Sequence, residues 1–75
     1  MMEVAMQLIY EGCHLEYVLK SRGMSKIVFS ERMGVSRSSV THWISGKNLM
    51  SVDKLFLACH ILKCRPEDIY KFRVD

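Results

Sequence analysis

Four polar side chains cluster near the middle of this 75-residue chain, at spacings that place them on one face of a helix. They are Arg37, Ser38, Thr41 and His42. Arg37 carries a rigid fork of donors, the two hydroxyls donate and accept, and the imidazole offers a ring nitrogen. Side chains three and four residues apart are neighbours on a helix surface. The set therefore has the chemistry of hydrogen-bonded recognition of a ligand.

Two short helices joined by a tight turn are predicted to hold these side chains, within residues 24–47. Ser25 has a hydroxyl that can cap the first helix, which should run to about Met33. Gly34 follows, because glycine accepts the left-handed backbone at a helix end without a Cβ clash. Ser36 is then placed to cap the second helix. The sequence thus predicts helix, turn and helix in succession.

The order of small and apolar residues in this stretch is that of a helix-turn-helix. Counting from Lys26, Ser30 is fifth, Gly34 ninth and Val40 fifteenth. The small side chain of Ser30 lets two helices cross closely, Gly34 makes the turn, and Val40 packs the second helix against the rest of the domain. Gly46 is expected to end that helix. The inward stripe of the second helix is Val40, Trp43 and Ile44, which turns the four polar side chains outward.

The segment GMSKIVFSERMGVSRSSVTHWISGK resembles the helix-turn-helix of the phage-repressor/Cro family of transcription factors, also called the xenobiotic-response-element family. Its most specific part is GVSRSSV followed by W-x-x-G-K, and the resemblance covers residues 15–70. It implies an all-α fold, a compact five-helix repressor-like DNA-binding domain. We divide the chain into an apolar N-terminal extension (1–12) for packing or dimerisation, the DNA-binding domain (13–72) and a C-terminal tail (73–75).

Three further helices are expected around the motif. The first covers residues 13–22, another begins at Ser51, and Pro66 opens a last helix over residues 67–72. The apolar stretch before Gly12 could extend the first helix backwards or form a separate helix or strand. In the helix after Ser51, the inward face is predicted to hold Val52, Leu55, Phe56, Cys59 and Leu62.

DNA recognition is assigned to the helix over about residues 36–45, which would enter the major groove. Arg37 is the first candidate for reading a base, because its donor fork matches O6 and N7 of guanine. Ser38, Thr41 and His42 occupy the other outward positions that the family uses for base contacts. The candidates for phosphate contact lie at helix ends and in the following loop: Ser25, Lys26, Ser36, Ser45, Lys47 and Asn48. Each serine can equally be a simple helix cap.

An apolar surface beyond the core indicates a second subunit or a partner protein. Its candidate residues are Ile9, Leu49, Met50, Leu57 and Ile61. Leu49 and Met50 are expected to be exposed, although packing within their loop explains them equally well. Because one small domain reads only a few base pairs, we predict a homodimer on a palindromic operator in double-stranded DNA. Repression is the commoner role in the family.

Composition sets outer bounds on these predictions. The chain is 49% hydrophobic and 25% charged, with a net charge of +3, as expected for one small globular domain that can bind nucleic acid. No apolar run reaches the ~20 residues of a bilayer span, so we expect a cytoplasmic protein without a membrane partner. No P-loop, activated nucleophile or catalytic carboxylate pair is recognisable. We therefore expect no enzyme activity, catalytic residue, cofactor or metal.

Two other interpretations fit parts of the sequence. The three cysteines are expected to be thiols, but Cys13-His14, Cys59-His60 and Cys64 could form a metal or redox sensor. Their spacing matches no standard zinc motif. Alternatively, the domain could be an antitoxin-like or anti-repressor module that binds a regulatory protein. Alanine at Arg37, Ser38 and His42 would separate that role from DNA binding.

Overall fold

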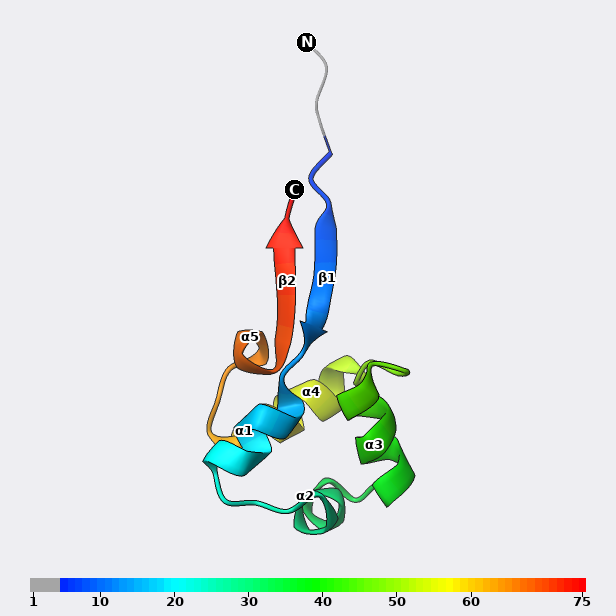
Figure 1. The fold of residues 1–75 in the computed structure, drawn as a ribbon, viewed down its shortest axis with the longest axis vertical. Coiled ribbons are helices and arrows are strands. Elements are labelled where there is room, and N and C mark those ends of the chain that lie inside the picture. The colour runs from blue at the N-terminus through cyan, green and yellow to red at the C-terminus, as the bar shows by residue number, and fades with distance from the viewer. Residues whose placement is uncertain (1–4) are drawn as a thin grey trace.

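The computed structural model describes residues 5–75, which form five short helices and a two-stranded antiparallel ribbon (Figure 1). The elements in chain order are β1 (Leu8–Cys13), α1 (Leu15–Ser21), α2 (Lys26–Met33), α3 (Arg37–Ser45), α4 (Val52–Leu62), α5 (Pro66–Ile69) and β2 (Tyr70–Val74). The helices pack together, and the ribbon projects from one end of the group, so that the C-terminus lies far from α2.

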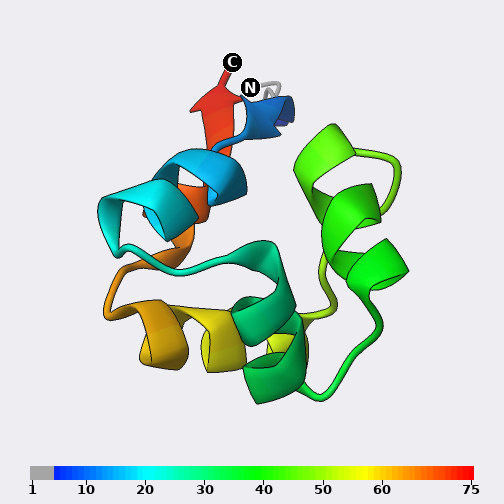
Figure 2. The ribbon, with the colours of Figure 1, turned by 60° about the horizontal axis from the view of Figure 1, so that its bottom comes forward.

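The two helices of the motif begin and end as the sequence predicts. The Ser25 hydroxyl accepts a hydrogen bond from the Val28 N–H at 3.1 Å, and the Ser36 hydroxyl accepts one from the Ser39 N–H at 3.2 Å. Gly34 ends α2 with a left-handed backbone at φ 69°. The predicted helix, turn and helix are therefore confirmed. Figure 2 shows α2 and α3 on either side of their turn.

Every helix contributes to one core. The largest fully buried side chains are Leu15 and Leu19 of α1, Phe29 of α2, Val40 of α3, Leu62 of α4 and Ile69 of α5. Ser30 is also buried, and its hydroxyl donates to the Ile27 carbonyl at 2.7 Å, so this small residue satisfies its own polar atom at the helix crossing. The core fixes the position of α3 relative to the rest of the domain.

The prediction of an all-α fold is wrong in one respect, because the two ends of the described chain pair as strands. Residues 8–13 pair antiparallel with residues 70–74, with Leu8 opposite Val74 and Tyr10 opposite Phe72. The predicted last helix, residues 67–72, instead ends at Ile69. The physical reason is the alternation in Tyr-Lys-Phe-Arg-Val, which suits a strand once a partner strand is present. A strand was one alternative for the N-terminal stretch; its residues 1–4 lie outside the described part.

The ribbon contains one irregularity, near the helices. The register shifts between Tyr10 and Gly12, so that Glu11 is an extra residue on β1. Gly12 has φ 134°, a conformation that residues with a Cβ rarely adopt. The break that the sequence suggested at Gly12 is thus a β-bulge within a strand.

Met50 is buried, and the prediction that it belongs to an exposed dimer or partner surface is wrong. Only 8% of Met50 is accessible, and its backbone N–H donates to the Tyr70 hydroxyl at 2.9 Å. Tyr70 is itself buried and begins β2. The loop before α4 is therefore held against the base of the ribbon by the side chain of a residue twenty positions later. Leu49, its neighbour, remains exposed.

Replacing Tyr70 by phenylalanine should reduce the free energy of unfolding by about 1–3 kcal/mol. The substitution keeps the ring but leaves the buried Met50 N–H without an acceptor. Urea unfolding followed by circular dichroism measures the loss. Tyr17→Phe is the matched control, since Tyr17 is largely exposed on α1 and its change should be close to neutral. Equal effects of the two changes would contradict the assigned hydrogen bond.

Burial of a thiol gives the fold a defined sensitivity to alkali. Burial raises the pKa of Cys59 from its ordinary value of 9.0 to about 11. Between these pH values the thiol of the unfolded chain ionises while the thiol of the folded chain stays protonated, so unfolding becomes more favourable as the pH rises. Below pH 9 this loss is absent.

We expect the thermal midpoint of the reduced protein to fall between pH 9 and about 11, and to fall less in Cys59→Ala. Burial also raises the pKa of Cys13, Cys64 and Tyr70, so part of the fall should persist in the variant. Thermal melts at a series of pH values give the comparison. Parallel curves for the two proteins would show that Cys59 does not contribute.

Candidate nucleic-acid interface

The outward face of α3 presents the predicted base-reading side chains together. Arg37, Ser38 and Thr41 are exposed and His42 is half-buried, whereas Trp43 on the opposite side of the helix is buried. Helical spacing puts the first four on one side, as predicted. In Figure 2, α3 lies at one edge of the molecule. A rigid helix thus carries donors and acceptors into solvent.

Arg37 is available for an external ligand. It is the first residue of α3, and none of the ion pairs found among residues 5–75 uses it. Its position follows directly from the cap, because Ser36 fixes where the helix begins. The guanidinium therefore extends from the N-terminal end of the helix, the end from which a helix-turn-helix contacts bases.

The phosphate candidates near the starts of α2 and α3 have partners within the domain. Ser25 and Ser36 both act as caps. The Lys26 ammonium lies 3.8 Å from a Glu16 carboxylate oxygen, and both side chains are about half exposed. A surface pair of this kind contributes little to stability, so Lys26 can exchange Glu16 for another anion at small cost.

The candidates beyond α3 form a compact turn. Ser45 donates its hydroxyl proton to the His42 carbonyl at 3.2 Å and accepts from the Lys47 N–H at 3.4 Å. The Asn48 N–H donates to the same His42 carbonyl at 3.3 Å. The backbone is thereby fixed while the side chains of Lys47 and Asn48 remain exposed. The phosphate candidates thus lie in three places: at the start of α2, at the start of α3, and at the end of α3 with the turn that follows it.

Sequence reasoning missed one residue that approaches the end of α3. A Cβ added to Gly46 would lie 3.6 Å from the Tyr10 hydroxyl, so β1 approaches the turn that ends α3. Tyr10 also packs its ring against Phe72, at a centroid distance of 5.3 Å. No local pattern could reveal this contact, because it depends on the ribbon formed by the two ends of the described chain.

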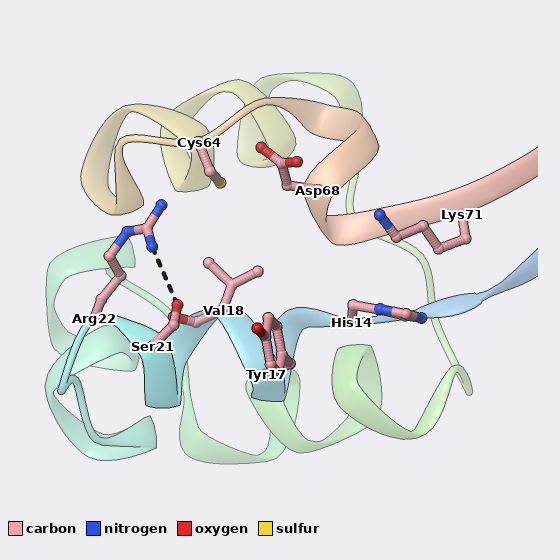
Figure 3. Close-up of a pocket in the computed structure, with 8 residues that line it drawn as sticks. All are labelled: His14, Tyr17, Val18, Ser21, Arg22, Cys64, Asp68 and Lys71. Atoms are coloured by element: carbon pink, nitrogen blue, oxygen red, sulfur yellow. Dashed lines mark hydrogen bonds between the residues drawn. The ribbon is translucent and has the colours of Figure 1, made fainter.

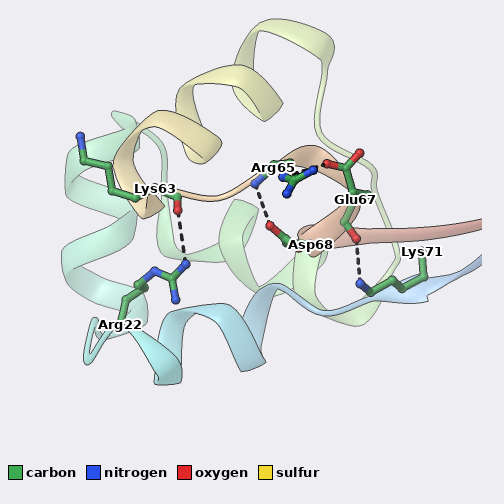
Figure 4. A network of polar contacts seen from close by, with 6 residues as sticks. All are labelled: Arg22, Lys63, Arg65, Glu67, Asp68 and Lys71. Carbon is green, nitrogen blue, oxygen red and sulfur yellow. Dashed lines mark hydrogen bonds and ion pairs between the residues drawn. The ribbon is translucent and has the colours of Figure 1, made fainter.

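A polar cleft of about 250 Å³ lies between α1 and α5 (Figure 3). Its lining includes His14, Tyr17, Arg22, Asp68 and Lys71. These residue types could bind a small anion, but three of the side chains already hold helix ends, as Figure 4 shows. The cleft is therefore a consequence of helix capping, and we assign no ligand to it.

The contacts around this cleft are specific. The Arg22 guanidinium donates to the Leu62 carbonyl at 2.7 Å and the Lys63 carbonyl at 3.3 Å, which satisfies the C-terminal end of α4. Asp68 accepts from the Arg65 N–H at 2.9 Å, and the Lys71 ammonium donates to the Glu67 carbonyl at 2.7 Å. Arg22 follows the end of α1, whereas its carbonyl acceptor at Leu62 lies forty residues later in the chain.

Arg22→Ala should lower the free energy of unfolding by about 1.5–3 kcal/mol, the range for hydrogen bonds from a charged donor. Lys63, one of the two acceptors, ends α4 with a left-handed backbone at φ 53°, which is unfavourable for a residue with a Cβ. Losing the Arg22 contact should therefore destabilise this helix end further. Chemical denaturation of the purified variant gives the value. The control is Arg32→Ala, an exposed arginine of α2 that should change stability by less than about 0.5 kcal/mol. A neutral Arg22→Ala would contradict the capping role.

The described residues provide no metal site and no membrane span. Within residues 5–75, no three side chains of His, Cys, Asp or Glu are arranged to hold a metal ion, so Cys13, Cys59 and Cys64 do not meet in a ligand set there. All three are free thiols. No helix in the same range has the length and apolar character to cross a bilayer.

Comparison with known proteins agrees with this geometry. A family model for the Cro/C1-type HTH DNA-binding domain matches residues 14–75. The crystal structure of a candidate DNA-binding protein from Bacteroides fragilis superposes with a TM-score of 0.73 at 22% identity, covering 87% of this chain and 100% of that chain. At this identity the likeness concerns the fold alone. No curated protein matches the chain.

Proposed function

Because this chain belongs to the family of Cro/C1-type helix-turn-helix DNA-binding domains, we propose that it represses transcription by binding a specific operator as a homodimer. The observation that carries the proposal is the outward face of α3, where Arg37, Ser38 and Thr41 are exposed above a buried Val40. Base edges in DNA are recognised by side chains of these types on a rigid helix.

The dimensions of α3 suit the major groove. An α-helix with its side chains is about 10–12 Å across, and the major groove is about 12 Å wide. Entering by its N-terminal end, α3 would bring Arg37 to O6 and N7 of a guanine. Ser38, Thr41 and His42 would follow along the neighbouring base pairs, with the Thr41 methyl group available to a thymine.

Phosphate contacts on both sides of α3 would fix its register in the groove. Ser25 and Lys26 lie at the N-terminal end of α2, where unpaired backbone N–H groups favour an anion. Ser36 and Ser45 flank α3, and the exposed side chains of Lys47 and Asn48 follow it. These contacts would supply affinity without sequence preference, and this part of the affinity would fall as salt rises.

Two copies would read two half-sites about 34 Å apart, which is why we propose a homodimer on a palindrome. Occupying such a site blocks access of other proteins to the same DNA, and this is the simplest route to repression. Ile9, Leu49, Leu57 and Ile61 remain proposed contributors to a dimer or partner surface. A regulator of this kind acts where the DNA is, so we also propose a cytoplasmic location.

The proposal is tested by incubating the purified protein with a randomised duplex library and sequencing the retained DNA at several salt concentrations. We expect a palindromic motif that persists as salt rises. A triple variant with alanine at Arg37, Ser38 and His42 is the control and should retain no motif. Retention without sequence preference by the native chain would overturn the proposal and favour a protein-binding role, for which Leu57 and Ile61 would be essential.

A further inference from the structure

One face of the ribbon is entirely apolar and open to solvent. Residues opposite each other in an antiparallel pair point to the same side, so Leu8 with Val74 and Tyr10 with Phe72 share a face. Leu8 is 66% exposed, Val74 57%, Phe72 42% and Tyr10 39%. We call these four residues the ribbon face. The other side carries the cross-strand pair of Ile9 and Arg73.

The ribbon face continues into an apolar groove beside α4. The groove has a volume of about 270 Å³, and its lining includes Leu8, Leu55, Pro66 and Phe72. Leu55 shares one side of α4 with Val52 and Phe56, because Leu55 and Phe56 follow Val52 at spacings of three and four residues. Val52 is 70% and Phe56 63% exposed, although the sequence pattern put both inward. Within the described residues, the ribbon face and this stripe of α4 therefore adjoin each other, and both are exposed to solvent.

This surface is large for a protein that remains alone in water. A fully exposed aromatic side chain presents about 150–250 Å², and Leu and Val present less. Scaled by their exposed fractions, the side chains of the ribbon face with Val52 and Phe56 together present on the order of 600 Å². That value is at the upper end for a monomer and approaches the roughly 800 Å² that each partner buries in a stable interface. A ribbon of two strands is also only marginally stable unless one of its faces is covered.

The charges around the ribbon favour a second copy of the same chain as the partner. β1 and β2 with the following residue carry two acidic groups, Glu11 and Asp75, and two basic groups, Lys71 and Arg73. Arg73 lies 3.3 Å from a Glu11 carboxylate oxygen and 3.6 Å from one of Asp75. The ribbon is therefore neutral and internally paired, so two copies meet without repulsion. A strongly charged partner would find no complementary charge there.

We propose that the ribbon face and the adjoining stripe of α4, Val52, Leu55 and Phe56, form an isologous interface on which a second copy of this chain docks. In such an interface the same patch of each subunit faces the other across a two-fold axis, so the groove beside Leu55 of each copy receives an apolar side chain of the other. The use of this dimer on DNA rests on the proposed function, whereas its formation does not. The interface differs from one centred on Leu57 and Ile61.

The test is sedimentation equilibrium of the full chain without DNA, at about 1 to 100 µM. The informative variant is L8E/V74K, which places a carboxylate opposite an ammonium at the solvent end of the ribbon. The two strands should still attract each other, while two of the four side chains of the ribbon face become charged. We expect the native chain to be a dimer and this variant to dissociate about 100-fold more readily or more. Leu57→Lys should remain a dimer.

Two further measurements make the outcome decisive. Circular dichroism melts should show that L8E/V74K unfolds cooperatively near the native midpoint, which separates loss of the dimer from loss of the fold. A native chain that is monomeric throughout the range, or a folded L8E/V74K that dimerises as tightly as the native chain, would overturn the interface. Failure of the proposed function would instead appear as a native dimer that selects no DNA sequence.

Discussion

Replacing Arg37 by alanine is expected to cost about 1–3 kcal/mol of binding free energy in each half-site of the operator. The side chain is exposed at the first position of α3, and its donor fork can satisfy two acceptors of one guanine. Binding should weaken most for the selected sequence, and the preference for guanine at one position per half-site should relax. Fluorescence anisotropy on duplexes that vary only at that position measures both effects.

Lys47→Ala is the matched control for this prediction. Lys47 is exposed in the turn after α3 and is proposed to contact a phosphate. Its loss should weaken binding to all sequences by a similar factor and reduce the slope of log K against log salt by about 1 for each subunit, or about 2 for the dimer. If Arg37→Ala behaved like Lys47→Ala, with base preferences unchanged, Arg37 would be a backbone contact and the assignment of direct readout would be wrong.

Phe29→Ala should be the most damaging single change to the fold, with a loss of about 3–5 kcal/mol in the free energy of unfolding. Phe29 is fully buried and anchors α2 in the core shared by the five helices. Small domains lie at the low end of the usual range of about 5–15 kcal/mol, so most of the stability would be lost. Urea denaturation at 25 °C gives the difference.

Val28→Ala provides the comparison for Phe29. It removes apolar atoms from the adjacent position on α2, where the side chain is 38% exposed, and should cost less than about 1 kcal/mol. The contrast tests whether α2 is oriented as described, with Phe29 inward. Similar losses for the two variants would mean that α2 is rotated or that its core contacts are absent.

The motif could be predicted from the sequence because its determinants are local. The hydroxyls of Ser25 and Ser36 lie within three residues of the N–H groups that they cap, and Gly34 makes its turn through its own backbone. The orientation of α3 follows from the spacing of Val40 and Trp43. The outward position of Arg37 could therefore be predicted as well, whereas its base contact remains a prediction.

The remaining features could not be predicted because they depend on residues far apart in the chain. β1 and β2 become strands by pairing Tyr10 with Phe72, and neither segment alone distinguishes a strand from a short helix. Met50 is buried because the Tyr70 hydroxyl accepts its N–H, and Arg22 finds its acceptors at the end of α4. Local patterns do not encode such contacts.

Contacts between distant residues also decide which side of α4 is buried. Its apolar residues surround much of the helix, so periodicity could not decide which side packs inward. The structure buries Ala58, Cys59 and Leu62 and leaves Val52 and Phe56 exposed. Only part of the apolar surface of α4 packs into the core. The exposed part, with Val52 and Phe56, belongs to the surface that we assign to a second copy.

The most direct test of the central claim, that α3 enters the major groove, is methylation interference on the selected duplex. Dimethyl sulfate modifies guanine at N7 in the major groove and adenine at N3 in the minor groove. We predict that N7 methylation blocks binding in two half-sites separated by about one helical turn, and that Arg37→Ala removes the block at one guanine in each. Binding that is insensitive to N7 methylation but blocked by N3 methylation would contradict the account.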